Sequence, residues 1–167
     1  MFQREASKAA QALLQLCRGQ GLKIATAESC TGGLVAALLT EIAGSSDVVE
    51  RGFVTYSNQA KIQMLGVDGP LIAQEGAVSE LVARAMAEGA LVHSQADISI
   101  AITGIAGPGG GSEAKPVGLV HLAAARRGFA TRHWRHVFNG DRQEVRLQAM
   151  LAAIDYCGEM AGLHPMA

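Results

Sequence analysis

An α/β sandwich built around a mixed sheet is the fold that the sequence predicts, and two observations predict it. Amphipathic helices alternate with short apolar strands up to about residue 103, an order typical of parallel strands joined by helices. Two further strands then follow each other with only a short link, which favours an antiparallel hairpin. No repeat or linker interrupts the 167 residues, so we expect a single domain over 1–167.

In the first half of the chain, apolar residues recur at helical spacing and then in short runs. Ala10, Leu13, Leu14 and Cys17 fall on one helical face and predict a first amphipathic helix. The elements expected next are a strand at 22–26, a helix at 34–42, a strand at 47–55 and a short helix at 58–65.

The second half begins with a long helix at 78–93 and ends with another helix from Asp141 onward. Between them the expected strands lie at 97–103, 117–125 and 131–138, the last two forming the hairpin. Asp141 followed by Glu144 three residues later is the pattern of a capping box, which supports a helix start at this point.

Composition excludes several classes of protein. The chain has 14 basic and 15 acidic residues, and only 4% of its residues are aromatic, so neither the charge nor the stacking surface of a nucleic-acid binder is present. No apolar run has the length of a membrane span, and the N-terminal residues do not resemble a signal peptide. Three widely spaced cysteines predict a reduced, cytoplasmic protein.

Ser29 lies where the first strand passes into a helix. The sequence Ala-Glu-Ser-Cys-Thr-Gly-Gly over 27–33 predicts Ser29 at the helix N-terminus, with Gly32 and Gly33 in the first turn. Free N–H groups and the helix dipole favour an anion or oxyanion there, and the glycines leave room for a ligand. A simple N-cap is an equally good interpretation from local chemistry alone.

Two other segments also follow strands, namely Tyr56 to Asn58 and the glycine-rich stretch 104–111. Open α/β sheets bind ligands beyond the carboxyl ends of their parallel strands. Three segments far apart in the sequence are therefore expected to meet in one crevice, which favours a functional role for Ser29 over a cap.

Together these segments resemble the C-terminal domain of the CinA family, and the resemblance covers nearly the whole chain. The motifs that carry it lie at residues 27–33, 56–61, 76–79, 103–110, 115–118 and 140–142. Resemblance to this family implies a three-layer α/β/α sandwich with a mixed, largely parallel sheet and a C-terminal antiparallel hairpin, often as a homodimer. It also implies hydrolysis of the carboxamide of nicotinamide mononucleotide to nicotinic acid mononucleotide and ammonia, in pyridine nucleotide salvage. Two-domain relatives carry a further N-terminal domain, whose activities are not transferred to this chain.

A serine–lysine mechanism without metal or cofactor is the chemistry that the resemblance implies. Ser29 is the expected nucleophile, and Lys61 is the expected general base because of its place in the motif that starts at Tyr56. A lysine acts as a base only if burial or nearby positive charge makes its neutral form accessible. Two roles remain equally open for Tyr56: a place in the proton network or the substrate pocket, and an ordinary half-buried aromatic at a strand end.

Two other side chains compete with Ser29 as nucleophile. Ser57 lies on the same helical face as Lys61 but has no adjacent Gly-Gly turn. Cys30 is expected to point away from Ser29 and to pack in the core. The Tyr-Lys spacing is one residue too long for a short-chain dehydrogenase, and no Gly-x-Gly-x-x-Gly motif accompanies it.

Substrate contacts are expected from the serine turn, the glycine loop and the last helix. Backbone N–H groups of Cys30, Thr31, Gly32 and Gly33 are candidates for an oxyanion hole, and the Thr31 hydroxyl either binds substrate or is an ordinary first-turn group. Glu28 either pairs with Lys61, offsets the substrate's pyridinium charge, or is solvated. The remaining expected contacts to the ribose phosphate are Thr103, Gly104 and Gly107 of the glycine loop, with Lys115 and Arg142 supplying charge.

Arg142 in the first turn of a helix opposes the helix dipole, which indicates a ligand or a partner carboxylate. The histidines predict no metal site: His133 and His136 face opposite sides of a strand, and His93, His121 and His164 are expected to have no companions.

Two other functions remain open. One is a module that binds a phosphorylated nucleotide without turnover in a competence or damage response, and the other is an amidase for an unphosphorylated amide.

Overall fold

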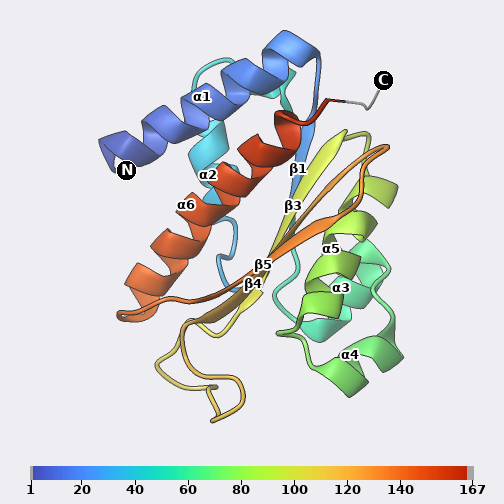
Figure 1. Ribbon diagram of the computed structural model, residues 1–167, viewed down its shortest axis with the longest axis vertical. Coiled ribbons are helices and arrows are strands. Elements are labelled where there is room, and N and C mark those ends of the chain that lie inside the picture. The colour runs from blue at the N-terminus through green and yellow to red at the C-terminus, as the bar shows by residue number, and fades with distance from the viewer. Residues whose placement is uncertain (1, 165–167) are drawn as a thin grey trace.

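The computed structural model describes residues 2–164, which form six α-helices, one short 3-10 helix and a five-stranded sheet (Figure 1). In chain order the elements are α1 (Arg4–Gln20), β1 (Ile24–Glu28), α2 (Leu34–Thr40), a 3-10 helix (Ser45–Asp47), β2 (Val49–Val54), α3 (Asn58–Leu65), α4 (Gly69–Glu75), α5 (Glu80–Val92), β3 (Ile98–Gly104), β4 (Leu119–Arg126), β5 (Arg132–Val137) and α6 (Arg142–Ala161).

The sheet is mixed, with strand order β2-β1-β3-β4-β5. β1 pairs in parallel with both β2 and β3, whereas β4 pairs antiparallel with β3 and with β5. The predicted C-terminal hairpin is therefore confirmed, and it extends a parallel core. Because β1, β2 and β3 are parallel, their carboxyl ends meet at one edge of the sheet.

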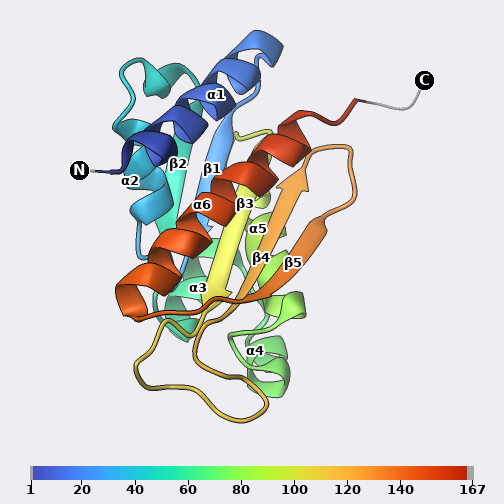
Figure 2. The same cartoon turned by 60° about the vertical axis from the view of Figure 1, so that its left-hand side comes forward.

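Helices cover both faces of this sheet, which gives the expected three layers (Figures 1 and 2). α1, α2 and α6 pack on one face, and α3, α4 and α5 pack on the other. Ile98, Ile100 and Ile102 of β3 enter the core under α6, while the alternating Ala101 enters the core under α5. No helix among the described residues is long and apolar enough to cross a membrane.

Three features differ from the sequence expectation. α4 is not expected from the sequence; it starts at Gly69 after the N-cap Asp68 and has a proline in its first turn, a position where proline fits a helix start. The strands of the hairpin are shorter than expected, since β4 starts at Leu119 and β5 spans Arg132–Val137. α2 starts at Leu34, so Gly32 and Gly33 precede the helix, and their φ angles of 59° and 100° lie in the left-handed region that glycine tolerates.

Candidate active site

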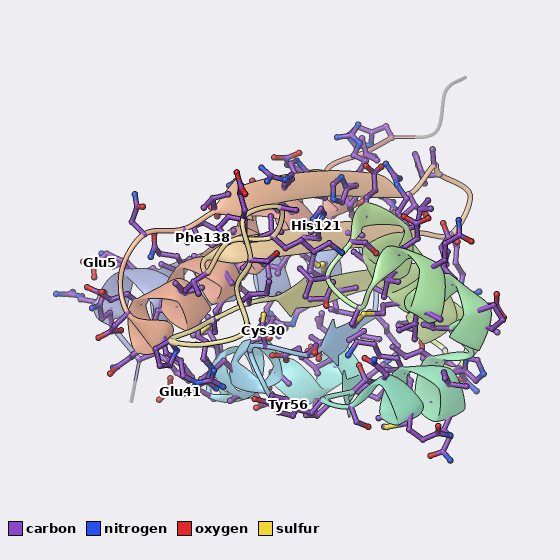
Figure 3. All side chains as sticks on the ribbon, turned by 90° about the horizontal axis from the view of Figure 1, so that it is seen from below. Glu5, Cys30, Glu41, Tyr56, His121 and Phe138 are labelled. Carbon is purple, nitrogen blue, oxygen red and sulfur yellow. The ribbon has the colours of Figure 1, made fainter. Side chains whose placement is uncertain are left out.

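The carboxyl ends of the three parallel strands lie together at one polar edge of the sheet. Ser29 follows β1 directly, and its N–H donates to the carbonyl of Ile102 on β3. On the other side of β1, the N–H of Thr55 donates to the carbonyl of Glu28. Figure 3 looks at this edge and shows Tyr56, Cys30 and His121 in that order across the sheet. The ends of β1, β2 and β3 therefore meet as predicted, whereas a single crevice shared by the three following segments stays a prediction.

Ser29 and Lys61 form a buried hydrogen-bonded pair at this edge. The Lys61 ammonium donates to Ser29 Oγ at 3.1 Å and to the Thr55 carbonyl at 2.9 Å. Lys61 is only 1% exposed and Ser29 9%. Ser29 Oγ and Lys61 Nζ thus lie within hydrogen-bond distance, as the serine–lysine hypothesis requires.

The position of Lys61 follows from the local start of α3. Ser57 is the N-cap, and its hydroxyl accepts from the N–H of Ala60. One turn later, Lys61 reaches back toward the end of β1 and lies against the sheet. The Lys61 amine contacts Ser29 Oγ and not the Ser57 hydroxyl, which argues against Ser57 as the competing nucleophile.

Burial lowers the pKa of Lys61 from its ordinary value of 10.5. No carboxylate of the described residues forms an ion pair with it, since its Nζ contacts only a hydroxyl and a carbonyl. When neutral, Nζ can accept the Ser29 hydroxyl proton while one of its own N–H groups still donates to Thr55. This arrangement is what a general base needs.

Glu28 does not pair with Lys61, which corrects one expectation. It is fully buried, and its carboxylate accepts from the N–H groups of Gly33, Val35 and Ala36 at 3.0, 3.1 and 2.9 Å. The carboxylate therefore caps α2 and compensates its dipole. The N-terminus of α2 is occupied by this side chain, so Ser29 is neither its cap nor backed by its free N–H groups.

The same contacts narrow the candidates for an oxyanion hole. Gly33 donates to Glu28, and Gly32 donates to the carbonyl of Ser29 at 3.0 Å, which closes a tight turn. Neither N–H is free for substrate, contrary to expectation. Within residues 2–164, the N–H groups of Cys30 and Thr31 donate to no other residue.

Cys30 and Thr31 have buried side chains. The Cys30 thiol packs in the core under α6, and burial raises its pKa to about 12, so it is a thiol at neutral pH and a poor nucleophile. Thr31 has no exposed surface, and its hydroxyl has no partner among the residues described. A contact between this hydroxyl and substrate stays a prediction.

Tyr56 lies beside the buried pair rather than within it. Its side chain is 62% exposed, and its hydroxyl accepts from Arg142 Nη2 at 3.0 Å. Arg142 Nη1 donates to the Gly107 carbonyl at 2.8 Å, so this arginine links the end of β2 to the glycine loop. The partners of Arg142 are a phenol and a carbonyl, not the carboxylate that its position suggested.

The glycine loop is held by contacts that the sequence did not show. Thr103 is buried, and its hydroxyl donates to the Ala77 carbonyl at 2.8 Å, so it braces the segment before α5. A Cβ on Gly104 would lie 2.7 Å from Val120 and 2.9 Å from the Leu119 carbonyl, which explains the glycine there. Lys115 donates to the Glu75 carbonyl at the end of α4. Thr103 and Lys115 are thus engaged in structural hydrogen bonds.

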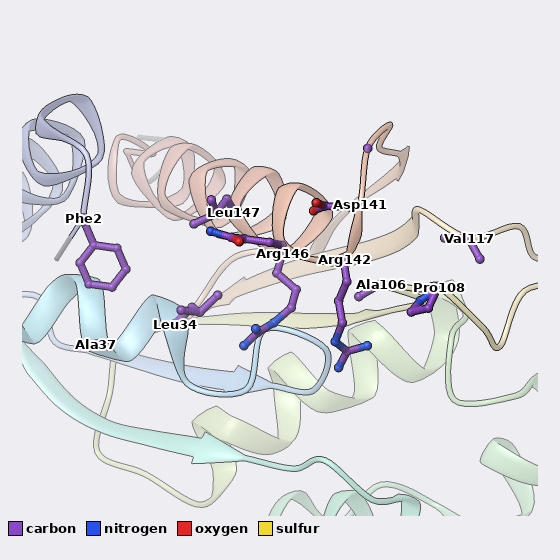
Figure 4. Close-up of a pocket in the computed structure, with 12 residues that line it drawn as sticks. Phe2, Leu34, Ala37, Ala106, Pro108, Val117, Asp141, Arg142, Arg146 and Leu147 are labelled. Atoms are coloured by element: carbon purple, nitrogen blue, oxygen red, sulfur yellow. The ribbon is translucent and has the colours of Figure 1, made fainter.

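A hollow of about 760 Å³ lies next to this edge, on the α6 side of the sheet (Figure 4). Leu34, Ala106, Pro108 and the start of α6 line it, and Arg142 and Arg146 extend from α6 along it. Ser29 and Lys61 are not among its lining residues. Arg146 was missed in the sequence; its spacing of four from Arg142, on one helix face, was the available signal.

The expectation that His121 has no companion is wrong. His121 Nδ1 lies 2.8 Å from His133 Nε2, on the face covered by α5, and His133 Nδ1 lies 3.5 Å from Glu80. Burial lowers the pKa of His121 to about 4. His136, on the opposite face as expected, contacts Tyr156. Across the described part of the chain, no three histidine, cysteine or carboxylate side chains are placed to hold a metal ion.

Residues 6–161 match the model of the CinA C-terminal domain. The chain belongs to this family. It is 54% identical over 140 residues to nicotinamide-nucleotide amidohydrolase PncC of Shigella flexneri, covering 84% of this chain and 85% of that protein. It is 55% identical over 141 residues to the protein of the same name from Escherichia coli K12, with the same coverage.

Longer proteins and solved structures of the family also match. A putative competence-damage inducible protein of Symbiobacterium thermophilum is 49% identical over an alignment of 155 positions, which covers 86% of this chain but only 36% of that protein. The crystal structure of the competence/damage inducible protein CihA from Agrobacterium tumefaciens has a TM-score of 0.92 at 48% identity, covering 93% of this chain and 95% of that one. An Escherichia coli CinA superfamily protein has a TM-score of 0.89 at 34% identity, over 98% and 94% of the two chains.

Proposed function

We propose that this chain is a nicotinamide-nucleotide amidohydrolase that converts nicotinamide mononucleotide and water to nicotinic acid mononucleotide and ammonia. The observation that carries the proposal is the buried contact between Ser29 Oγ and Lys61 Nζ, in a lysine whose pKa is lowered and which has no ion-pair partner among the described residues. The amidohydrolases of Shigella and Escherichia, which are more than half identical to this chain, support the same activity.

In the first half of the reaction, Ser29 attacks the carboxamide carbon. Neutral Lys61 takes the hydroxyl proton as the bond between Oγ and carbon forms, which gives a tetrahedral oxyanion. The protonated Lys61 then donates this proton to the amide nitrogen, the carbon–nitrogen bond breaks, and ammonia leaves. An ester between Ser29 and the nicotinoyl group remains.

In the second half, water replaces ammonia. Lys61 takes a proton from the water, whose oxygen attacks the ester carbon, and returns the proton to Ser29 Oγ as the ester bond breaks. The product is nicotinic acid mononucleotide. The pyridinium ring of the substrate is itself a cation, so its approach disfavours the protonated form of the buried lysine and favours the base.

We assign substrate recognition to the exposed part of the same edge. Arg142 offers a fixed positive charge to the phosphate, and the exposed ring of Tyr56 offers a face for the cationic pyridinium ring. The proposal places the enzyme in pyridine nucleotide salvage in the cytoplasm, where its three free cysteines stay reduced, and as a homodimer. Light scattering of the purified chain tests the dimer.

The test is ammonia release from nicotinamide mononucleotide, with nicotinic acid mononucleotide identified as the second product. Ser29→Ala and Lys61→Met should both lose activity, whereas the exposed Ser46→Ala and Lys8→Met should keep it. Binding of the mononucleotide without ammonia release would instead support a nucleotide-binding module. Equal cleavage of free nicotinamide would support an amidase for unphosphorylated amides.

A further inference from the structure

Arg146 of α6 contacts the turn that follows Ser29. Its Nε donates to the carbonyl of Cys30 at 3.0 Å, and its Nη2 donates to the carbonyl of Thr31 at 2.9 Å. None of the ion pairs found between described residues includes Arg146. The planar guanidinium therefore holds two successive carbonyl groups of one tight turn, which fixes their direction.

Fixing a carbonyl also fixes the N–H on the other side of the same peptide bond. In a planar trans peptide the two groups point in opposite directions, and the only cis peptide found in residues 2–164 is Gly107-Pro108. Because the Cys30 carbonyl points to Arg146, the Thr31 N–H points away from it. Arg146 approaches from the α6 side of the sheet, whereas Lys61 approaches from the α3 side.

The Thr31 N–H is also one of the two N–H groups in the turn that no other described residue accepts from, and Thr31 itself is fully buried beside Ser29. Gly32 and Gly33 donate to the Ser29 carbonyl and to Glu28, while the N–H of Thr31 has no acceptor among the residues described. A charge-assisted hydrogen bond to the carbonyl polarises the peptide and strengthens its N–H as a donor.

We propose that Arg146 is a positioning residue that holds the Cys30-Thr31 peptide so that the Thr31 N–H donates to the oxyanion formed when Ser29 attacks. This inference rests on the proposed function, because it assumes acyl transfer to Ser29. Arg146 itself contacts the turn and not the substrate. The pairing explains why α6, at the far end of the sequence, packs against the segment after β1.

The first test separates transition-state from ground-state effects. Loss of one oxyanion donor lowers kcat by about 10²–10³-fold in other enzymes, and here the donor is displaced rather than deleted. We expect Arg146→Met to lower kcat by roughly 10- to 100-fold with KM changed less than about twofold. Arg146→Lys, which keeps the charge but not the planar fork, should lie between Arg146→Met and the wild type. The exposed Arg132→Gln is the matched control.

The second test uses sulfur in place of the carbonyl oxygen, because sulfur is a weak hydrogen-bond acceptor. The wild type should prefer nicotinamide mononucleotide to thionicotinamide mononucleotide, and Arg146→Met should reduce this preference in kcat/KM by about tenfold. If Arg146→Met lowers kcat/KM by the same factor for both substrates, the preference between them is unchanged. Arg146 then has only a general structural role, and the proposal is wrong.

A third test does not need the native substrate. A fluorophosphonate probe labels an activated serine: Ser29 Oγ bonds to phosphorus, fluoride leaves, and Lys61 takes the proton. We expect the probe to label Ser29 at least about tenfold more slowly in Arg146→Met than in the wild type. Mass spectrometry locates the label, and thermal unfolding curves check that both proteins are folded. Equal labelling rates, or no labelling of wild-type Ser29, would overturn the inference. Labelled wild type that releases no ammonia would instead refute the proposed substrate.

Discussion

The cations on the two faces of the sheet differ in what they contact. On the α3 side, Lys61 is buried, and burial lowers its pKa. On the α6 side, Arg142 and Arg146 bind carbonyl groups of the glycine loop and of the serine turn. Lysine loses its proton when burial is costly enough, whereas arginine stays charged in proteins. The comparison teaches that one face can move a proton, and the other supplies fixed charge and holds backbone in place.

Replacing the buried lysine by arginine should have the largest effect on activity. Lys61→Arg keeps a positive charge near Ser29 but cannot accept a proton at neutral pH. We expect ammonia release to fall at least about 10³-fold, as much as in Lys61→Met. Steady-state assays of both variants, with Lys8→Arg as the control, check this. Substantial activity in Lys61→Arg would show that Ser29 is activated by something other than this lysine.

Removing the fixed charge at the other face should weaken binding without changing the proton transfer. We expect Arg142→Gln to raise KM for nicotinamide mononucleotide by about 10- to 100-fold, which corresponds to about 1.5–3 kcal/mol for a hydrogen bond to a charged group. The pH dependence of kcat should stay as in the wild type. A variant with unchanged KM would remove Arg142 from substrate recognition.

Replacing Lys61 by methionine should stabilise the fold, although it should abolish activity. Because the folded pKa is lowered, burying the charged form destabilises the fold at every pH below that pKa. This destabilisation decreases as pH rises above the lowered pKa of the folded state. It is lost above pH 10.5, where the lysine of the unfolded chain is also neutral. Lys61→Met should therefore be more stable than the wild type at pH 7, by about 1 kcal/mol, and the gain should shrink at alkaline pH. Urea unfolding at several pH values measures this.

The smallest effect is expected at the helix cap. Ser57→Ala removes the hydroxyl that accepts from the Ala60 N–H and should lower the free energy of unfolding by about 1 kcal/mol. The variant should still be labelled and acylated at Ser29. Loss of the acyl-enzyme in Ser57→Ala, with the fold intact, would make Ser57 the nucleophile after all.

Much of the fold could be predicted because its signals are local. The isoleucines of β3, the Asp141–Glu144 capping box and the apolar stripe of α5 each follow from residue spacing, and all are observed. The convergence at the strand ends followed from the parallel order. The short helix α4 could not be predicted because it buries only Ile72 and so shows no apolar stripe, unlike the equally short α2.

The partners of polar side chains at the site were harder to predict. Glu28 caps a helix that starts six residues later, and Arg146 contacts carbonyls more than a hundred positions away. His121 meets His133 only through the register of β4 and β5. Each of these contacts depends on tertiary geometry, so residue type and spacing identify the candidates but not their partners.

The central claim is that Lys61 is a buried base poised to lose its proton, and an NMR titration of its side chain tests this most directly. Lysines labelled with ¹³C at Cε are followed over pH, and the Lys61 resonance is assigned by its absence in folded Lys61→Met. The account predicts that Lys61 titrates below the ordinary 10.5, and that kcat/KM rises with pH along the same curve. A Lys61 that titrates at or above 10.5 in the folded protein would contradict it.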